Sequence, residues 1–151
     1  MKTVKFTEKE KAVLRQAEII YARKLRTHTI QSAEMAGRYC QAKLAHSERE
    51  IFAVLLVDSQ HQVIDFVELF KGTINAAAVY PREIVKLALE HNAAACLLCH
   101  NHPSNVNQPS DADIRLTKDV TAALQLIDVQ VLDHFIVSAS GFYSFAQHGR
   151  L

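Results

Sequence analysis

The sequence lacks the features that mark membrane-spanning or disulfide-rich secreted proteins. No stretch reaches the roughly 18 consecutive apolar residues that a transmembrane helix needs. The amino terminus leads into charged residues instead of the apolar core of a signal peptide. The three cysteines are an odd number and do not form a disulfide framework. We therefore expect a soluble, cytoplasmic protein with no membrane partner, in a reducing compartment.

Linkers, internal repeats and low-complexity tracts are also absent from the sequence. A chain of 151 residues with 49% hydrophobic residues suits one domain built around a single core. The net charge of +1 gives no global attraction to nucleic acid, but residues 1–26 carry eight Lys/Arg and three Glu, which makes this arm +5 and leaves −4 for the rest. Such a basic arm can contact phosphates, and the solvated face of a helix is the alternative interpretation.

Hydrophobic periodicity predicts helices interleaved with strands. Helical spacing of apolar residues predicts helices over residues 8–26, 32–45, 82–91 and 111–126. Apolar runs of strand length lie at residues 51–57, 62–70, 93–99 and 142–145, and residues 129–132 and 134–137 form either one further strand or a pair. Residues 73–79 form a short apolar or irregular segment. A short polar turn after residue 57 implies an antiparallel pair, while a helix before residue 93 permits a crossover. The sequence therefore predicts an α/β (α+β layered) domain with a mixed, mainly antiparallel sheet flanked by helices.

The first predicted helix has a clear start and an apolar face. Thr7 and Glu10 match a capping box. The apolar residues that recur at helical spacing after it are Val13, Leu14, Ala17, Ile20 and Tyr21. This amphipathic helix needs a partner surface.

Two histidines follow the predicted strand at residues 93–99. Side chains on an extended segment repeat every second residue, so the imidazoles of His100 and His102 can converge on one point, for which a metal ion is the obvious candidate. Ser110 opens the next helix, and Asp113 in its first turn supplies a third, oxygen ligand. Three protein ligands and an open position for water are typical of catalytic zinc.

The same residues also have simpler interpretations. Ser110 and Asp113 match the Ser-x-x-Asp form of a capping box, and a His-x-His pair also occurs as ordinary polar structure. Cys96, Cys99 and His100 spell the C-x-x-C-H signature of c-type haem. Strand alternation places these two cysteines on opposite faces, so we expect them in the core. The His-x-Glu and Pro-Cys-x-x-Cys motifs of zinc deaminases are missing.

Taken together, His100-Asn101-His102-Pro103 and Ser110-Asp111-Ala112-Asp113 resemble the signature of the JAMM (MPN+) zinc metalloprotease superfamily. Within it the chain is most similar to the RadC-like proteins. The motifs that carry this closer resemblance are Leu69-Phe70-Lys71-Gly72-Thr73, Pro81-Arg82-Glu83-Ile84, Pro109-Ser110 and Leu132-Asp133-His134. The resemblance implies an MPN/JAMM-like fold, which is cytidine-deaminase-like, over residues 30–151. Residues 1–29 are then a basic N-terminal helical extension.

Two departures from the family pattern stand out. Asn105 occupies the position after His-Asn-His-Pro-Ser where the family usually has glycine. This replacement affects the conformation of the loop and leaves the predicted ligands in place. The chain also lacks the helix-hairpin-helix segment of longer RadC proteins, so it resembles the short form.

The resemblance implies roles for further residues. One Zn²⁺ would be bound by the two histidines and the aspartate. Glu50, at the start of the first core strand, would be the general base, with Glu48 as the runner-up. Ser110 would stabilise an oxyanion as a neutral donor, while a role as helix N-cap fits the sequence equally well. The implied activity is a zinc-dependent hydrolase that cleaves peptide or isopeptide (amide) bonds in a peptide or protein substrate.

A binding module is the second hypothesis. In it, a metal-bearing or metal-free domain recruits protein or DNA partners through the basic arm, with a DNA-repair-associated role and little or no protease activity. His134, beside a predicted buried strand, either orients a partner near the site or is a satisfied core residue. The sequence specifies neither the substrate nor the oligomeric state.

Overall fold

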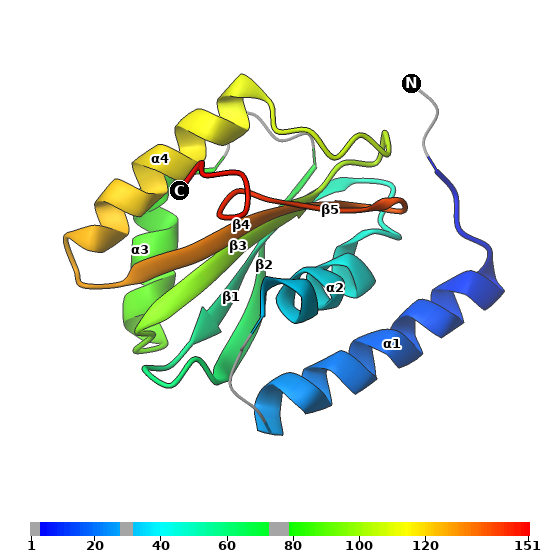
Figure 1. Ribbon diagram of the computed structural model, residues 1–151, viewed down its shortest axis with the longest axis horizontal. Helices are drawn as coiled ribbons and strands as arrows, with labels where there is room; N and C mark the ends of the chain where they lie inside the picture. Colours follow the sequence, from blue (N-terminus) through cyan, green and yellow to red (C-terminus); the bar gives the residue numbers. More distant parts are fainter. Residues whose placement is uncertain (1–3, 28–31, 73–78) are drawn as a thin grey trace.

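A five-stranded sheet carries helices on both of its faces (Figure 1). The computed structural model describes residues 4–27, 32–72 and 79–151, so most of the irregular segment predicted at residues 73–79 lies outside the described residues. In chain order the elements are α1 (Glu8–Thr27), α2 (Ala33–Leu44), β1 (Glu50–Val57), β2 (Val63–Gly72), α3 (Pro81–Glu90), β3 (Ala95–Asn101), α4 (Asp111–Gln125), β4 (Gln130–Ser138) and β5 (Gly141–Ser144).

The sheet is mixed and mainly antiparallel, as predicted. Its strand order is β2-β1-β3-β4-β5. β1 pairs antiparallel with β2 and β3, and β5 pairs antiparallel with β4. β3 and β4 run parallel, and α4 makes the crossover that a parallel neighbour requires. The predicted fold class is confirmed and is consistent with an MPN/JAMM-like fold.

The continuous apolar run of β1 is explained by cover on both sides of the sheet. Phe52, Val54 and Leu56 belong to the core cluster that contains residues of α3 and α4. The alternate residues belong to the cluster that contains residues of α2. A strand buried on both faces needs no polar alternation, and this burial makes β1 and β3 the rigid centre of the fold.

β3 extends further than the apolar run suggested. It includes His100 and Asn101 and is buried over its whole length. Cys96 and Cys99 lie in the clusters on opposite sides of the sheet, which confirms their predicted place in the core. Facing opposite sides, the two thiols cannot attach one haem.

β4 is one strand, which is one of the two alternatives that the sequence left open for residues 129–137. A register shift opposite the Cys96/Leu97 step accommodates the extra residue. The buried Asp133 carboxylate accepts hydrogen bonds from the backbone N–H of His134 at 2.7 Å and from the hydroxyl of Ser144 at 2.5 Å. Because its lone pairs are satisfied, this charged side chain does not interrupt the strand.

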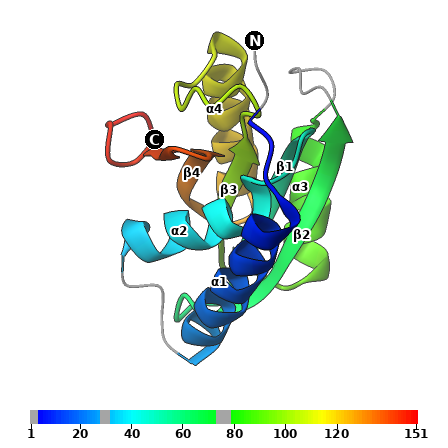
Figure 2. The same cartoon turned by 90° about the vertical axis from the view of Figure 1, so that its right-hand side faces the viewer.

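α1 begins at the predicted capping box. The Thr7 N–H donates to the Glu10 carboxylate at 2.7 Å, and the Glu10 N–H donates to the Thr7 hydroxyl at 3.2 Å. The helix lies beside α2 (Figure 2). Among the described residues no helix is both long enough and apolar enough to cross a bilayer.

The face that α1 turns toward α2 is narrower than predicted. Tyr21 packs against the α2-side core, and Lys43 of α2 forms an ion pair with Glu18 at 2.7 Å. Val13 and Ile20, which belong to the predicted apolar face, are 63% and 47% exposed, because one neighbouring helix covers only a single stripe of α1.

The cysteines should be chemically inert in the folded protein. Burial raises the pKa of Cys96 to about 12, and burial together with the neighbouring Cys40 raises that of Cys99. Since the thiolate is the reactive form, we expect no thiol to react with a disulfide reagent at about pH 8, and all three to react in denaturant. Rapid labelling of the native protein would contradict this packing.

Removal of residues 1–29 should leave the sheet intact. The truncated chain loses the Tyr21 contact and the Glu18–Lys43 pair, and we expect a cost of roughly 1–2 kcal/mol, which lowers Tm by about 2–8 °C. Zinc content should equal that of the full chain. Thermal unfolding and elemental analysis of both chains test this, and a truncated chain that does not fold would place the extension within the core domain.

Candidate metal centre

The site forms where the carboxyl end of β3 meets the first turn of α4. Strand alternation places His100 on the same face as Cys96 and Leu98, which belong to the core cluster on the α3 and α4 side of the sheet. His102 follows one residue after the strand ends. Asp113 comes from the opposite direction, from the buried side of α4.

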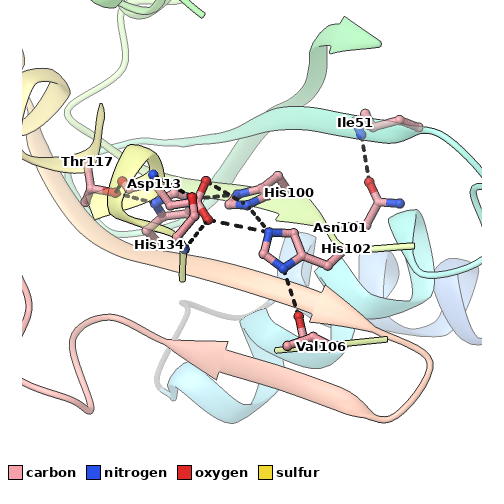
Figure 3. A network of polar contacts seen from close by, with 9 residues as sticks. Ile51, His100, Asn101, His102, Val106, Asp113, Thr117 and His134 are labelled. Atoms are coloured by element: carbon pink, nitrogen blue, oxygen red, sulfur yellow. Dashed lines mark hydrogen bonds and ion pairs between the residues drawn. The ribbon is translucent and has the colours of Figure 1, made fainter. Parts of the chain in front are cut away.

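The three predicted ligands converge, as Figure 3 shows. The Nε2 atoms of His100 and His102 lie 2.9 Å apart. Oδ1 of Asp113 lies 3.3 Å from His100 Nε2, and Oδ2 lies 3.5 Å from His102 Nε2. Tetrahedral zinc with bonds of about 2.0–2.1 Å separates its ligand atoms by roughly 3.3 Å. The group can therefore hold a metal ion.

Asp113 also completes the capping box of α4. The Ser110 N–H donates to Oδ2 of Asp113 at 2.8 Å, and the Asp113 N–H donates to the Ser110 hydroxyl at 3.1 Å. A carboxylate has about four acceptor positions, so it can cap a helix and face a metal at the same time. The capping interpretation of this motif is therefore confirmed and is compatible with the metal-binding interpretation, and the cap fixes the direction of the carboxylate.

The charges around the three side chains favour a cation. Burial raises the pKa of Asp113, but hydrogen bonds with His100, His102 and the Ser110 amide outweigh it and hold that pKa well below its usual range. Burial lowers the pKa of His102, yet its contacts with Asp113 and Val106 and the charge of Glu50 raise it overall. The same field attracts either a proton or a metal ion to this point.

The ring of His102 is held by the loop that follows it. Its Nδ1 lies 2.8 Å from the carbonyl oxygen of Val106. A carbonyl only accepts, so Nδ1 carries the proton and Nε2 is left to bind a metal. The backbone of the loop, and not a side chain, therefore orients the His102 imidazole.

The ligands line a cleft of about 890 Å³. Glu50, at the first position of β1, is half-buried in its wall, while Glu48 lies on the rim and is exposed. Ser110 also borders the cleft. The residues that line it are Glu48, Arg49, Glu50, Lys71, Gly72, His100, His102, Pro103, Ser104, Val106, Gln108, Pro109, Ser110 and Asp113. Both candidate bases and the candidate oxyanion donor are therefore gathered around the metal ligands.

Asn101, between the two histidines, was not predicted to matter. It points to the other face of the strand, where its Oδ1 accepts from the Ile51 N–H at 2.7 Å (Figure 3). Its Nδ2 donates to the Arg49 carbonyl at 2.9 Å. These bonds tie the segment that carries Glu48 and Glu50 to the strand that carries the ligands. Only the alternation of the strand signalled that this side chain faces away from the histidines.

The conformation of Asn105 explains why asparagine can stand where the family usually has glycine. Its φ is +65°, in the left-handed region that glycine adopts without cost and that asparagine tolerates better than most residues. Its Oδ1 also accepts from the Ser140 N–H at 2.9 Å. The substitution therefore preserves the loop and ties it to the turn after β4.

Comparison with known families agrees with this geometry. The RadC-like JAB domain family matches residues 30–150. The chain belongs to this family. A "UPF0758 protein" of Tolumonas auensis is 54% identical over 83% of the chain and 56% of its own length, and one of Idiomarina loihiensis is 56% identical over 78% of the chain and 52% of its own length.

The relatives are longer than this RadC-like chain. A "UPF0758 protein" of Shewanella pealeana is 47% identical over 97% of the chain and 65% of its own length. The chain spans about half to two thirds of the curated relatives it matches. The names of these relatives state no reaction, so the family supports the fold and the metal-binding group but leaves the activity to be argued from the site.

Replacing Asp113 should separate metal binding from helix capping. In Asp113→Asn the amide oxygen can still accept from the Ser110 N–H, but the anionic ligand is lost. We expect about one zinc per chain in the wild type and almost none in this variant. Asp113→Ala should lose zinc and also about 1 kcal/mol of stability with the cap.

Elemental analysis and thermal unfolding of the metal-free proteins measure the two effects. Metal content equal to wild type in Asp113→Asn would remove this residue from the ligand set.

Proposed function

We propose that this RadC-like domain is a zinc-dependent hydrolase that cleaves peptide or isopeptide bonds. The observation that carries the proposal is the convergence of His100, His102 and Asp113 in a cleft that also holds the half-buried Glu50. JAB-like domains include metallohydrolases. Two imidazoles and one carboxylate suit zinc better than magnesium or calcium. When bound, zinc would polarise a carbonyl and lower the pKa of water to about 7.

Glu50 is the residue best placed to act as the general base. Its charge contributes to the raised pKa of His102, so the carboxylate lies near the ligands. It starts β1, which pairs with β3 through Phe52 and His100, and Asn101 binds the backbone of both its neighbours, Arg49 and Ile51. From this position it would accept a proton from the attacking water and pass it to the leaving amine. Glu48, on the rim, is the second candidate.

Ser110 can serve the reaction without giving up the helix cap. Its hydroxyl oxygen accepts from the Asp113 N–H, which uses a lone pair and leaves the O–H hydrogen able to donate. Because Ser110 borders the cleft, that hydrogen can be directed toward a developing oxyanion. A neutral donor next to the metal ligands would stabilise the transition state without competing for the ion.

The size and the lining of the cleft support a polypeptide substrate. Its volume of about 890 Å³ is in the range of pockets that enclose organic ligands. Arg49 and Lys71 contribute charge to the lining, and Pro103, Val106 and Pro109 contribute apolar surface. A peptide presents backbone polar groups and side chains together, which such a mixed lining can accommodate.

Glu50→Gln should retain zinc and lose turnover. The amide keeps the size of the side chain but cannot take a proton, so hydrolysis of a peptide or isopeptide substrate should fall by roughly 10²–10⁴-fold. Glu48→Gln is the matched control and should stay active. The measurement is cleavage of a panel of peptide and isopeptide substrates, with zinc content determined on the same samples.

Two results would change this assignment. If Glu48→Gln loses activity and Glu50→Gln keeps it, the base is Glu48. If the zinc-loaded wild type cleaves no amide substrate and binds DNA in a salt-sensitive manner that survives His100→Ala, the protein is a binding module that uses its basic arm.

A further inference from the structure

We infer that His134 and Thr117 are positioning residues that fix the tautomer of His100, with the proton on Nδ1 and a free lone pair on the metal-facing Nε2. The inference rests on the proposed zinc site and is independent of hydrolysis. Both residues lie behind the ligands, away from the cleft, in a chain of contacts that joins α4, β4 and β3 (Figure 3).

His134 is enclosed by apolar rings. It is fully buried on β4, directly opposite Leu98 of β3. Its ring stacks on Phe145 with centroids 4.6 Å apart, and it meets Phe52 edge-on at 5.8 Å. Water cannot easily replace a hydrogen bond in such surroundings, so each ring nitrogen depends on the partner that the fold provides.

Thr117 sets the direction in which the hydrogen bonds of this series are donated. Its hydroxyl donates to the carbonyl oxygen of Asp113, one helical turn earlier, at 2.6 Å. A hydroxyl has one hydrogen, and a carbonyl has none to offer. The second contact of Thr117 Oγ1, 2.6 Å to Nδ1 of His134, must therefore be donated by the histidine.

The tautomer of His134 then determines that of His100. His134 is fully buried between the rings of Phe52 and Phe145, where a charged imidazolium would be costly, so the ring is neutral. With its proton on Nδ1, the Nε2 atom of His134 is an acceptor. The 2.9 Å contact with Nδ1 of His100 is thus donated by His100, whose Nε2 keeps its lone pair.

The two ligands therefore reach the same tautomer by different means. His102 uses the backbone carbonyl of Val106, whereas His100 depends on two buried side chains. Partners behind a ligand typically change metal affinity by about 10–100-fold when they are removed. Since a backbone carbonyl cannot be deleted by substitution, the side-chain route is the one that mutation can test.

Thr117→Val and Thr117→Ser form a matched pair. Valine keeps the shape but offers no acceptor, so the His134 proton should move to Nε2, where it points at His100 Nδ1 and drives the proton of His100 to its own Nε2. Serine keeps the hydroxyl. We expect zinc affinity, measured by competition with a chromophoric chelator, to fall about 10–100-fold in Thr117→Val and to stay close to wild type in Thr117→Ser.

Long-range ¹H–¹⁵N correlation spectra of the metal-free proteins report the tautomers directly. We expect the proton of His100 on Nδ1 in the wild type and in Thr117→Ser, and on Nε2 in Thr117→Val. A wild type with the proton on His100 Nε2, or a folded Thr117→Val variant with an unchanged tautomer, would overturn the inference. A wild type that shows the expected tautomer but binds no zinc would overturn the zinc site alone.

Discussion

The carboxylate of Asp113 is the interaction on which the site depends. It accepts a hydrogen bond from the backbone N–H of Ser110, the N-cap of its own helix, and it faces the imidazoles of His100 and His102. Its negative charge lies near the positive end of the helix dipole, where it is stabilised. The start of α4 and the metal-binding group are therefore one structure, and neither can be repositioned without the other.

Consecutive residues of β3 have different roles because their side chains point to opposite faces of the sheet. His100 points to the side of α4, where it meets the other ligands, and Asn101 points to the opposite side, where it holds the start of β1. Both are almost fully buried, so their polar atoms must be satisfied within the protein. In a strand covered on both faces, one residue can in this way be a candidate ligand while the next residue holds the segment that carries the candidate base.

Much of this arrangement was predictable from the sequence. Continuous apolar runs located the strands, period-two alternation sent the two cysteines to opposite faces, and the spacing of His100, His102 and Asp113 located a group that can hold a metal ion. Thr117 was not foreseen, because a threonine on the buried side of a helix looks like any small core residue until its partner is known. The sequence left open whether residues 129–137 form one strand or a pair, since a buried aspartate is compatible with a strand only when distant groups satisfy it.

The spacing of Asp113 and Thr117 on α4 has a mechanical consequence. They lie one turn apart on the same side of one helix: Asp113 offers a candidate ligand atom, and Thr117 ends the series of hydrogen bonds that leads to His100. A tilt or slide of α4 across the sheet would move both together. The distance between the candidate ligands and the hydrogen bond behind His100 would then change at the same time, because both depend on the position of this one helix.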